Sequence, residues 1–549
     1  MAGAGRVIEI SPRRRRVGLA LYAVLTVLSF PHELPGGASI DFGLVFAWLG
    51  PAGLVVGLHG LSPWRAARIA FAASLVCHSV LFHWFAVVTV VYGGMPVGLG
   101  VLAPILPAFY VSLFTALFAW AWAWARDAFG QPVLVGAILW TAVDWARGHF
   151  LGGFPWATLG YALHLDLPLL GWTRWGGVYL LSFFAVAVAI AIATAWLDRN
   201  DASRRQLVIT LVLILVAHGL GALLAAEERS DAPTVRVAAI QGNIEQGQKW
   251  DPNRRHQIFE TYLRLSSEAG DEGVDWIVWP ETAVPGLIEY DGELRSRIGV
   301  LARRYDAALM VGGMGIDLAS DGRPSAYYDS AFHFDRGGAV RARYDKTHLV
   351  PFGEYVPLRA LLGQVFQSLA TGLSSTDVTA GATPRALEMT TGAGADVRVR
   401  VGVPICYELL FPHLVRKFAA DGAGVLLAIT NDAWYGRTGA PHQFLAMTAL
   451  RSAESGRWTV RAANTGISAI IDSQGRVRQA SALFEEAVVA GEIPIATDGA
   501  ITFYARYGDA FAWLCVLVSA VLLAERHWAK RGRPAIDGVA NGDGEARAG

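Results

Sequence analysis

Long apolar stretches, each close to the length that crosses a bilayer, fill most of the first 225 residues and return once near the end. A spanning helix needs about 20 predominantly apolar residues. We expect eight spans, at 17–31, 39–60, 67–92, 98–125, 132–148, 175–196, 206–225 and 509–525. Only 17% of the residues are charged, whereas soluble domains carry about 25%. The chain is therefore predicted to be a polytopic helical membrane protein with an extramembrane domain.

Basic residues in the connecting loops predict the orientation of the spans. They are Arg13 to Arg16, Arg65, Arg68, Arg126, Arg199, Arg204, Arg205, Arg526, Lys530, Arg531 and Arg533. With eight spans, all of these fall on one side, which the positive-inside rule assigns to the cytoplasm. The large segment between the last two spans is then expected on the periplasmic or exterior side. The formal net charge is zero, which argues against a nucleic-acid partner.

The segment between the last two spans has the pattern of one α/β domain. Short apolar, β-branched runs at 234–241, 276–280, 308–314, 330–335, 397–406, 425–430, 467–472 and 487–493 predict strands. Helical patterns intervene at 254–269, 293–305, 409–422 and 442–456. Such alternation indicates a layered α/β fold. The expected organisation is a membrane domain of about seven helices at 1–225, a catalytic domain at 226–508, a last span at 509–525 and a disordered cytoplasmic tail at 526–549.

Three chemically suited side chains follow predicted strands of this domain. Glu281 stands in WIVWPET, Lys346 in YDKTHLVPFGEYVP, and Cys406 in VGVPICYE. Cys406 is also the one cysteine of three that lies outside the predicted spans, so it has no disulfide partner in its own domain. Taken singly, each residue has an ordinary interpretation: a loop carboxylate, a solvated lysine, a buried core thiol. A glutamate, a lysine and a cysteine that all follow strands of one domain indicate a nucleophilic site.

The chemistry of a cysteine nucleophile needs these residue types. A free thiol has a pKa of about 8.5 and is mostly protonated at neutral pH. Glu281 is expected to take its proton, provided that burial raises the pKa of this carboxylate. Lys346 is expected to stabilise the thiolate and the later oxyanion, together with the backbone N–H of Tyr407 at a helix start. The product of the first step is an acyl-enzyme thioester.

The motifs together resemble the nitrilase superfamily of carbon–nitrogen hydrolases and, within it, the apolipoprotein N-acyltransferase family. The resemblance covers about residues 10–525 and rests on GFPW (153–156), QGNI (241–244), WPE (279–281), PFGEYVP (351–357), CYE (406–408), NDAWYG (431–436) and NTGIS (464–468). It implies an αββα sandwich inserted before the last span, and a Glu281–Lys346–Cys406 triad. It also implies supporting roles for Glu354, Tyr407 and Glu408, and a place for Trp250 on a loop near the substrate entrance, although plain packing explains that tryptophan equally well.

The resemblance implies a specific reaction at a membrane surface. A fatty acyl chain would pass from the sn-1 position of phosphatidylethanolamine to Cys406, and then to the α-amino group of a diacylglyceryl-cysteine at the N-terminus of a lipoprotein. The expected location is the bacterial inner membrane, with the catalytic domain on the periplasmic side. A monomer is expected, without a cofactor or a metal, since the histidines of the domain are scattered and no phosphate-binding loop is present.

Some features leave alternatives open. Asp144 and Arg147, at the end of the fifth predicted span, either pair with each other or bind a lipid headgroup. Asp329 stands where the family pattern leads us to expect asparagine, and FPHELPGG (30–37) is not typical of the family.

A membrane-tethered amidase acting on a small exported amide would use the same triad, and a transporter or scaffold with an inactive domain is a third possibility. The apolar segment 361–373 favours the acyltransferase, because it is suited to an arm that dips into the bilayer.

Overall fold

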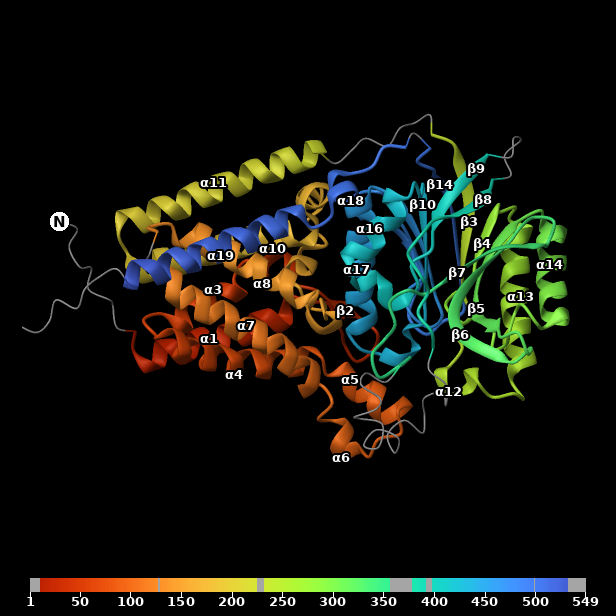
Figure 1. The fold of residues 1–549 in the computed structure, drawn as a ribbon, viewed down its shortest axis with the longest axis horizontal. Coiled ribbons are helices and arrows are strands. Elements are labelled where there is room, and N and C mark those ends of the chain that lie inside the picture. Colours follow the sequence, from red (N-terminus) through yellow and green to blue (C-terminus); the bar gives the residue numbers. More distant parts are fainter. Residues whose placement is uncertain are drawn as a thin grey trace, which may run out of the picture.

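The computed structural model describes residues 10–126, 129–224, 232–355, 378–391, 397–497 and 499–531. Long helices gather at one end of an elongated molecule and β-sheets at the other (Figure 1). The arm predicted at 361–373 and the tail from residue 532 onward lie outside the described residues.

Helices occupy each of the eight positions predicted as spans. The elements of this part are α1 (Pro12–Leu28), β1 (His32–Glu33), β2 (Ser39–Ile40), α2 (Gly43–Phe46), α3 (Gly50–Leu58), α4 (Pro63–Leu81), α5 (Trp84–Val87), η1 (Val88–Tyr92), α6 (Val97–Gly100), α7 (Ile105–Ala125), α8 (Pro132–Arg147), η2 (Phe150–Gly152), η3 (Leu159–Leu163), α9 (Leu167–Leu170), α10 (Thr173–Asp198), α11 (Asp201–Leu224), α18 (Phe503–Tyr507) and α19 (Ala510–Arg531). The α10–α11 junction and the C-terminal end of α19 lie away from the sheets (Figure 1).

Not all of these helices meet the length and composition of a membrane span. Among the described residues, four do: Val97–Ala125, Thr173–Asp198, Asp201–Leu224 and Ala510–Ala529. The pair Pro63–Leu81 and Trp84–Tyr92, bent by 55°, would make a fifth. The remaining predicted spans correspond to shorter helices, of which α1 has 17 residues and four arginines and α8 has 16 residues. Membrane character is thus confirmed, and a count of eight spans stays a prediction.

Two sheets packed face to face form the α/β domain. The described strands of one sheet run in the order β13 (Val477–Ala480), β12 (Ala469–Ile471), β11 (Trp458–Ala463), β10 (Val425–Thr430), β9 (Arg398–Gly402) and β8 (Leu387–Thr390). Those of the other run in the order β14 (Ala487–Pro494), β3 (Thr234–Gln241), β4 (Trp276–Val278), β5 (Ala308–Leu318), β6 (Pro324–Phe334) and β7 (Val340–Asp345). Helices α13 (Arg255–Asp271) and α14 (Gly292–Tyr305) cover the second sheet, and α16 (Pro412–Ala420) and α17 (Ala440–Ser455) cover the first (Figure 1). The predicted αββα sandwich is confirmed.

The central strands of both sheets are parallel and buried. β3 and β5 flank β4 in parallel, and β9 and β11 flank β10 in the same way. Every residue of β10 is buried, as is usual for strands covered on both faces. The carboxyl ends of parallel strands meet at one edge of each sheet, where ligands of α/β domains usually bind. Glu281, Cys406, Asn431 and Asn464 follow the ends of such strands.

Helix α17 connects the sandwich to the membrane helices through buried polar contacts. Glu454 Oε1 accepts a hydrogen bond of 2.8 Å from the backbone N–H of Val178, beside the break in α10 at Gly177. Trp156, in the predicted GFPW motif, donates from Nε1 to Gln443 Oε1 at 2.7 Å. Such buried bonds are costly to leave unmade, so they fix the sandwich against the apolar helices.

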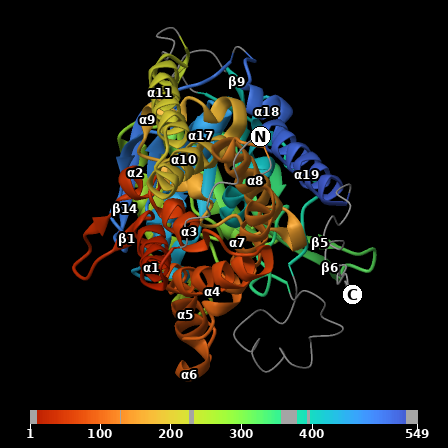
Figure 2. The same ribbon diagram turned by 90° about the vertical axis from the view of Figure 1, so that its left-hand side faces the viewer.

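A projection from the helical part reaches the sandwich near its site edge. It comprises α5, η1 and α6, which extend away from the other helices in Figures 1 and 2. The ring of Trp84 lies 5.0 Å from that of Tyr435, and the ring of Tyr92 lies 5.6 Å from that of Trp434. Both partners belong to the NDAWYG segment, which forms the short helix η6 (Asp432–Tyr435).

Candidate active site

Glu281 follows β4 and lies in a loop that packs tightly on β5. The backbone N–H of Ala283 donates to the carbonyl of Gly312 at 3.0 Å. A Cβ at position 312 would come within 2.1 Å of the carbonyl oxygen of Pro280, so this path of the loop requires glycine. The Glu281 side chain is buried and faces Lys346.

Lys346 follows β7 directly and is fully buried among three carboxylates. Its Nζ atom lies 2.8 Å from Glu281 Oε1, 2.5 Å from Glu354 Oε1 and 3.3 Å from Asp329 Oδ2. A buried ammonium is stable only when it is paired and hydrogen-bonded. Lys346 is therefore not an ordinary solvated lysine, and the predicted pair of Glu281 and Lys346 is in contact.

Cys406 begins the 3-10 helix η5 (Cys406–Leu410) and is buried, with a φ of 45°. Left-handed backbone in a residue other than glycine is strained and often marks a functional position. The turn is secured by Glu408, whose Oε2 accepts from the backbone N–H of Ile405 at 2.8 Å. Its Oε1 accepts from the N–H of Thr347 at 2.7 Å, next to Lys346. The Glu408 carboxylate thus connects the turn at Cys406 to the residues that follow β7.

Glu354 and Tyr407, the other predicted supporting residues, also lie at this site. Glu354 accepts from Lys346 through one oxygen and from the backbone N–H of Val350 through the other, at 2.8 Å. The Tyr407 ring is buried and stacks against His348, with centroids 5.7 Å apart. The oxyanion role of the Tyr407 N–H stays a prediction.

The charges around Glu281 contradict the expectation that the pKa of this base is raised. Burial does raise the pKa of Glu281, but the positive charge of Lys346 and hydrogen bonds from Asp329 and Lys346 outweigh it and hold this pKa to about 2. Burial raises the pKa of the Cys406 thiol well above its usual value, and the charge of Glu281 adds to this, while Lys346 opposes it. The resting site therefore pairs an ionised glutamate with a protonated thiol.

Two further residues of the site were missed as candidates. Lys249, at the end of α12 (Gln246–Lys249), is 2% exposed and donates to the backbone carbonyl of Glu281 at 3.0 Å. Burial lowers its pKa to about 8, although the charges of Glu281, Asp329 and Cys406 act in the opposite direction. Asp329 is the third carboxylate at Lys346. The aspartate in YYDS, where asparagine was expected, was a sequence signal for Asp329. For Lys249 the only signal was its neighbour in the sequence, the candidate residue Trp250.

Neutral amide side chains follow β10 and β11, which lie in the same sheet as β9, the strand before Cys406. The backbone of Asn431 lowers the pKa of the Cys406 thiol, and Ile429 of β10 pairs with Ile405, the residue before Cys406. The Asn431 side chain donates to Gln246 Oε1 at 2.8 Å and accepts from Asn464 Nδ2 at 3.1 Å. Asn464 in turn accepts from the N–H of Ile244 at 2.9 Å. The QGNI, NDAWYG and NTGIS motifs therefore meet in one hydrogen-bonded network, which we call the amide wall (Gln246, Asn431 and Asn464).

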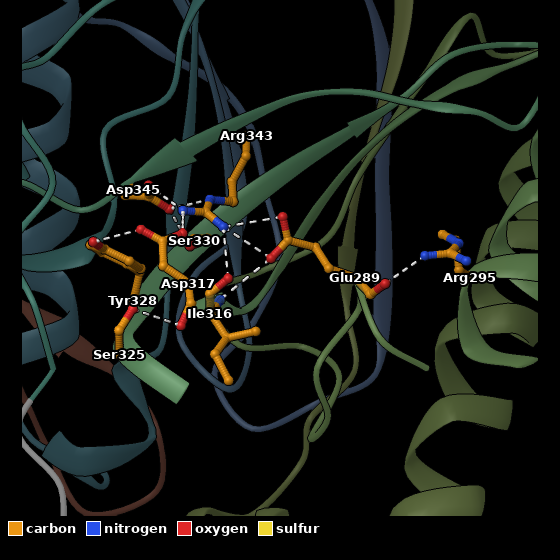
Figure 3. A network of polar contacts seen from close by, with 9 residues as sticks. All are labelled: Glu289, Arg295, Ile316, Asp317, Ser325, Tyr328, Ser330, Arg343 and Asp345. Carbon is orange, nitrogen blue, oxygen red and sulfur yellow. Dashed lines mark hydrogen bonds and ion pairs between the residues drawn. The ribbon is translucent and has the colours of Figure 1, made fainter. Parts of the chain in front are cut away.

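A second network, shown in Figure 3, is centred on Arg343 of β7 and includes Asp345, the residue before Lys346. Arg343 donates to both oxygens of Glu289, at 3.1 and 2.9 Å, and to Asp317 and Asp345, at 2.9 and 3.1 Å. Ser330, beside Asp329, donates to Asp345, beside Lys346, at 2.5 Å. These contacts connect β5, β6 and β7 to the segment that follows Glu281, and so position both residues of the ion pair.

Two groups of described residues have the spacing of metal ligands. The oxygens of Glu281, Asp329 and Glu354 lie within 4.8 Å of one another, and the Lys346 ammonium contacts all three of these carboxylates. The second group is His149, His413 and Asp509. There the imidazole rings of His149 and His413 are tilted, with centroids 4.5 Å apart, and His149 pairs with Asp509 at 3.3 Å. Lys346 thus explains the geometry of the first group, whereas Nδ1 of His413 in the second group is buried without a hydrogen-bond partner among the described residues.

The sequence is similar to known proteins over both parts of the molecule. Residues 236–501 match the carbon-nitrogen hydrolase family, and residues 22–191 match the apolipoprotein N-acyltransferase N-terminal domain. An apolipoprotein N-acyltransferase of Geobacter metallireducens is 37% identical over 521 residues, which cover 93% of this chain and 95% of that protein. The chain belongs to the apolipoprotein N-acyltransferase family. Another member, from Pseudomonas aeruginosa, is 35% identical and covers 87% of this chain and 90% of its own length.

Among solved structures, an amidase from Nesterenkonia sp. is similar, with a TM-score of 0.35 and 19% sequence identity, covering 47% of this chain and 93% of the amidase.

The three substrate-binding candidates of this family member lie in different surroundings. Asp144 and Arg147 are buried and pair at 3.1 Å, and Arg147 also donates to Thr158 Oγ1 and to the carbonyl of Trp156, both at 2.9 Å. Because these bonds hold the loop that contains GFPW, the pairing interpretation is favoured over headgroup binding. Trp250 is 55% exposed at the end of α12, as a residue near a substrate entrance should be, and its role stays a prediction.

Proposed function

We propose that this protein transfers a fatty acyl chain from the sn-1 position of phosphatidylethanolamine to the α-amino group of the N-terminal diacylglyceryl-cysteine of lipoproteins. The main support is that the turn at Cys406 and the Glu281–Lys346 pair are buried in a domain that is hydrogen-bonded directly to the apolar helices. Both substrates are anchored in a membrane by their lipid chains. An active site held next to membrane helices can reach them.

In the first half-reaction, Cys406 Sγ attacks the ester carbonyl and forms a carbon–sulfur bond. Glu281 takes the thiol proton, and Lys346 stabilises the negative charge on the former carbonyl oxygen. Because Glu281 is a weak base and the thiol pKa is raised, proton loss is coupled to carbon–sulfur bond formation. The tetrahedral intermediate then expels the glycerol oxygen, which takes the proton from Glu281. The products are lysophospholipid and a thioester on Cys406.

In the second half-reaction, the neutral α-amine of the acceptor attacks the thioester carbonyl. Glu281 takes a proton from the nitrogen, and the carbon–sulfur bond breaks as the amide forms. The proton returns to the sulfur and restores the Cys406 thiol. Glu354 and Glu408 do not take part in bond changes: the first orients Lys346 and the second holds the cysteine turn against the lysine strand.

We place the protein in the bacterial inner membrane, with the sandwich on the periplasmic side. Support comes from the basic loop residues, because the α10–α11 junction and the end of α19 lie at the end of the molecule opposite the sheets (Figure 1). The positive-inside rule assigns that end to the cytoplasm. Lipid-modified acceptors would then meet the catalytic domain on the outer face of the membrane.

Intact-protein mass spectrometry tests this proposal. Purified protein incubated with phosphatidylethanolamine should gain one fatty-acyl mass, which hydroxylamine removes. Cys406→Ser should prevent the thioester. Cys77→Ala, which changes a buried cysteine of α4, is the matched control and should acylate normally. The adduct should disappear when a diacylglyceryl peptide is added, and the peptide should gain the same mass.

The outcome that contradicts the proposal is also defined. If no adduct forms while Cys406 still reacts with an alkylating reagent, phospholipid is not the donor. The membrane-tethered amidase would then be the better interpretation, and release of ammonia from small amides would test it.

A further inference from the structure

A polar cavity of about 480 Å³ lies at the carboxyl-end edge of the sandwich. Its walls come from the segment after β3, from α13 and from the segment after β11, and Tyr92 of the projection also contributes. Its lining includes six uncharged amide and hydroxyl side chains, those of Asn243, Gln246, Gln248, Gln257, Thr261 and Thr465, and three charged ones, those of Glu245, Arg254 and Glu486. Apolar surface comes from Ile244, Ile258 and Phe484. We call this cavity the amide pocket.

The amide pocket shares a wall with the nucleophile. Gln246 lines the pocket and accepts a hydrogen bond from the Asn431 side chain at 2.8 Å. Asn431 directly follows β10, and Ile429 of that strand pairs with Ile405, the residue before Cys406. Ala433, two residues after Asn431, also lines the pocket. The pocket therefore borders the segment that follows β10, which lies beside the segment of the reacting cysteine.

One buried group of the pocket lacks a partner within the protein. Thr465 is 1% exposed, and its hydroxyl has no hydrogen-bond partner among the described residues. Buried hydroxyls in folded proteins are nearly always hydrogen-bonded. Thr465 belongs to the lining, so a polar ligand group that displaces the atoms covering this hydroxyl would give it a partner.

The lining selects a class of ligand. An acyl chain would need a predominantly apolar surface, because burying polar groups without partners is costly. A polypeptide instead offers one N–H and one C=O per residue, and amide side chains can both donate to it and accept from it. Resting on the proposed function, we infer that the amide pocket binds the polypeptide of the lipoprotein acceptor, at the residues that follow its lipid-modified N-terminal cysteine.

This assignment separates the two substrates in space. The phospholipid donor has no polypeptide, so it does not need the amide pocket. The acceptor needs it only in the second half-reaction, when its amine must reach the thioester on Cys406. Filling the pocket should therefore slow transfer to a peptide acceptor and leave thioester formation unchanged.

Gln257→Trp is the variant that tests this inference. Gln257 is exposed in the first turn of α13 and lines the pocket, so a tryptophan fills space there without disturbing the core. His256→Trp is the matched control, because His256 is the neighbouring exposed residue and is not in the lining. Two acceptors are compared: dipalmitoylglyceryl-cysteine followed by four residues, and dipalmitoylglyceryl-cysteine amide, which has none.

The expected result is a difference between acceptors. Gln257→Trp should lower kcat/KM for the peptide acceptor at least tenfold, and should leave kcat/KM for the amide acceptor and the rate of thioester formation within twofold. Thr465→Val, which removes only the unpartnered hydroxyl, should lower kcat/KM about threefold for the peptide acceptor alone. His256→Trp should behave as the unchanged protein does.

Two results would overturn the inference. An equal loss with both acceptors would mean that the pocket supports the site generally, and no loss with either would mean that the polypeptide lies elsewhere. Failure of the proposed function has a different signature, namely the absence of thioester on the unsubstituted protein, and it would remove the inference as well.

Discussion

The two sides of Cys406 differ in their chemistry although both are buried. On one side, Lys346 is surrounded by Glu281, Asp329 and Glu354. On the other side, the neutral side chains of the amide wall hydrogen-bond one another. Charges cost most to bury and interact most strongly where water is excluded. The charged side is therefore suited to stabilising charge that changes during reaction, and the amide wall to holding uncharged groups in place.

The comparison also shows where the two sides meet. Lys249 comes from the same short helix as Gln246 of the amide wall, yet its ammonium contacts the carbonyl of Glu281. Glu408 makes a second connection, from the cysteine turn to Thr347 beside Lys346. Substitutions on the charged side should alter rates and their pH dependence, whereas those on the amide side should alter acceptor preference.

Lys346→Met should have the largest effect. It removes the cation that stabilises the oxyanion and leaves Glu281, Asp329 and Glu354 buried without a partner charge. Loss of an oxyanion donor costs about 10²–10³-fold in rate, so thioester formation should fall by about 10³-fold or more. Rapid quenching with mass spectrometry measures this rate. Lys417→Met, on the exposed face of α16, is the control, and activity within tenfold of normal would contradict the role of Lys346.

Glu408→Gln should have the next largest effect, because it disturbs the connection between the cysteine and lysine segments. Glu408 accepts four hydrogen bonds, from Tyr344, from Ile405 and twice from Thr347. A glutamine can place its oxygen on one side only, so donors on the other side would face an N–H group. Loss of bonds to a charged group costs about 2–3 kcal/mol, which denaturant unfolding measures.

Thioester formation by Glu408→Gln should slow by about 10–100-fold, as expected when a supporting contact shifts reacting groups by about 1 Å. Glu388→Gln changes an exposed glutamate of β8 and should affect neither quantity. An unchanged free energy of unfolding would show that Glu408 is not the connection that its contacts indicate.

The sequence predicted Glu281 and Cys406 because each follows an apolar run, whereas Lys346 follows the polar strand β7 and was predicted from its motif. β3 and β10 match their predicted bounds at 234–241 and 425–430, and their mostly apolar residues explain why. Four described strands of the α/β domain were missed: β7, β8, β11 and β13. β7 contains two arginines and two of the four residues of β13 are polar, so neither has an apolar run. β11 contains Arg461, whose burial depends on an ion pair with Asp432 from another segment.

Lys249 and Asp329 could not be predicted as site residues for a related reason. Each is polar, and its burial depends on contacts between segments that are distant in the sequence. Lys249 meets Glu281 across 32 positions, and Lys346 meets Asp329 across 17. The count of eight membrane spans stays a prediction, because apolar stretches such as 132–148 form helices shorter than a typical span.

Lys249→Met should produce a moderate effect that depends on pH. The ammonium faces the thiol region, so its removal should disfavour the thiolate. Alkylation of Cys406 by iodoacetamide should shift to higher pH, and thioester formation at pH 7 should slow about tenfold. Lys249→Arg should restore the alkylation profile in part. An unchanged alkylation profile, with activity merely reduced, would assign Lys249 a structural role only.

Lys249→Met should also change the way in which the stability of the protein depends on pH. Burial lowers the pKa of Lys249 from 10.5 in the unfolded chain to about 8 in the folded protein. The folded state therefore binds fewer protons between pH 8 and 10.5, so this group makes the protein more stable as pH rises through that window. Lys249→Met should lose this rise, and Tm measured between pH 7 and 10.5 should show the difference.

Asp329→Asn should have the smallest effect on activity, within about threefold, because it keeps the shape of a protonated carboxyl group. Burial and the charge of Glu281 raise the pKa of Asp329 well above its usual range, and three ionised carboxylates around one ammonium would leave a buried negative excess. A carboxyl group whose pKa is higher in the folded protein than in the unfolded chain makes the protein less stable as pH rises from the unfolded pKa towards the folded pKa. The Asp329→Asn variant has no such group. Its Tm should therefore exceed that of the unsubstituted protein at pH 7 and vary less above pH 4. Equal Tm values across this range, or a hundredfold loss of thioester formation, would mean that Asp329 is ionised and acts as a third negative charge on Lys346.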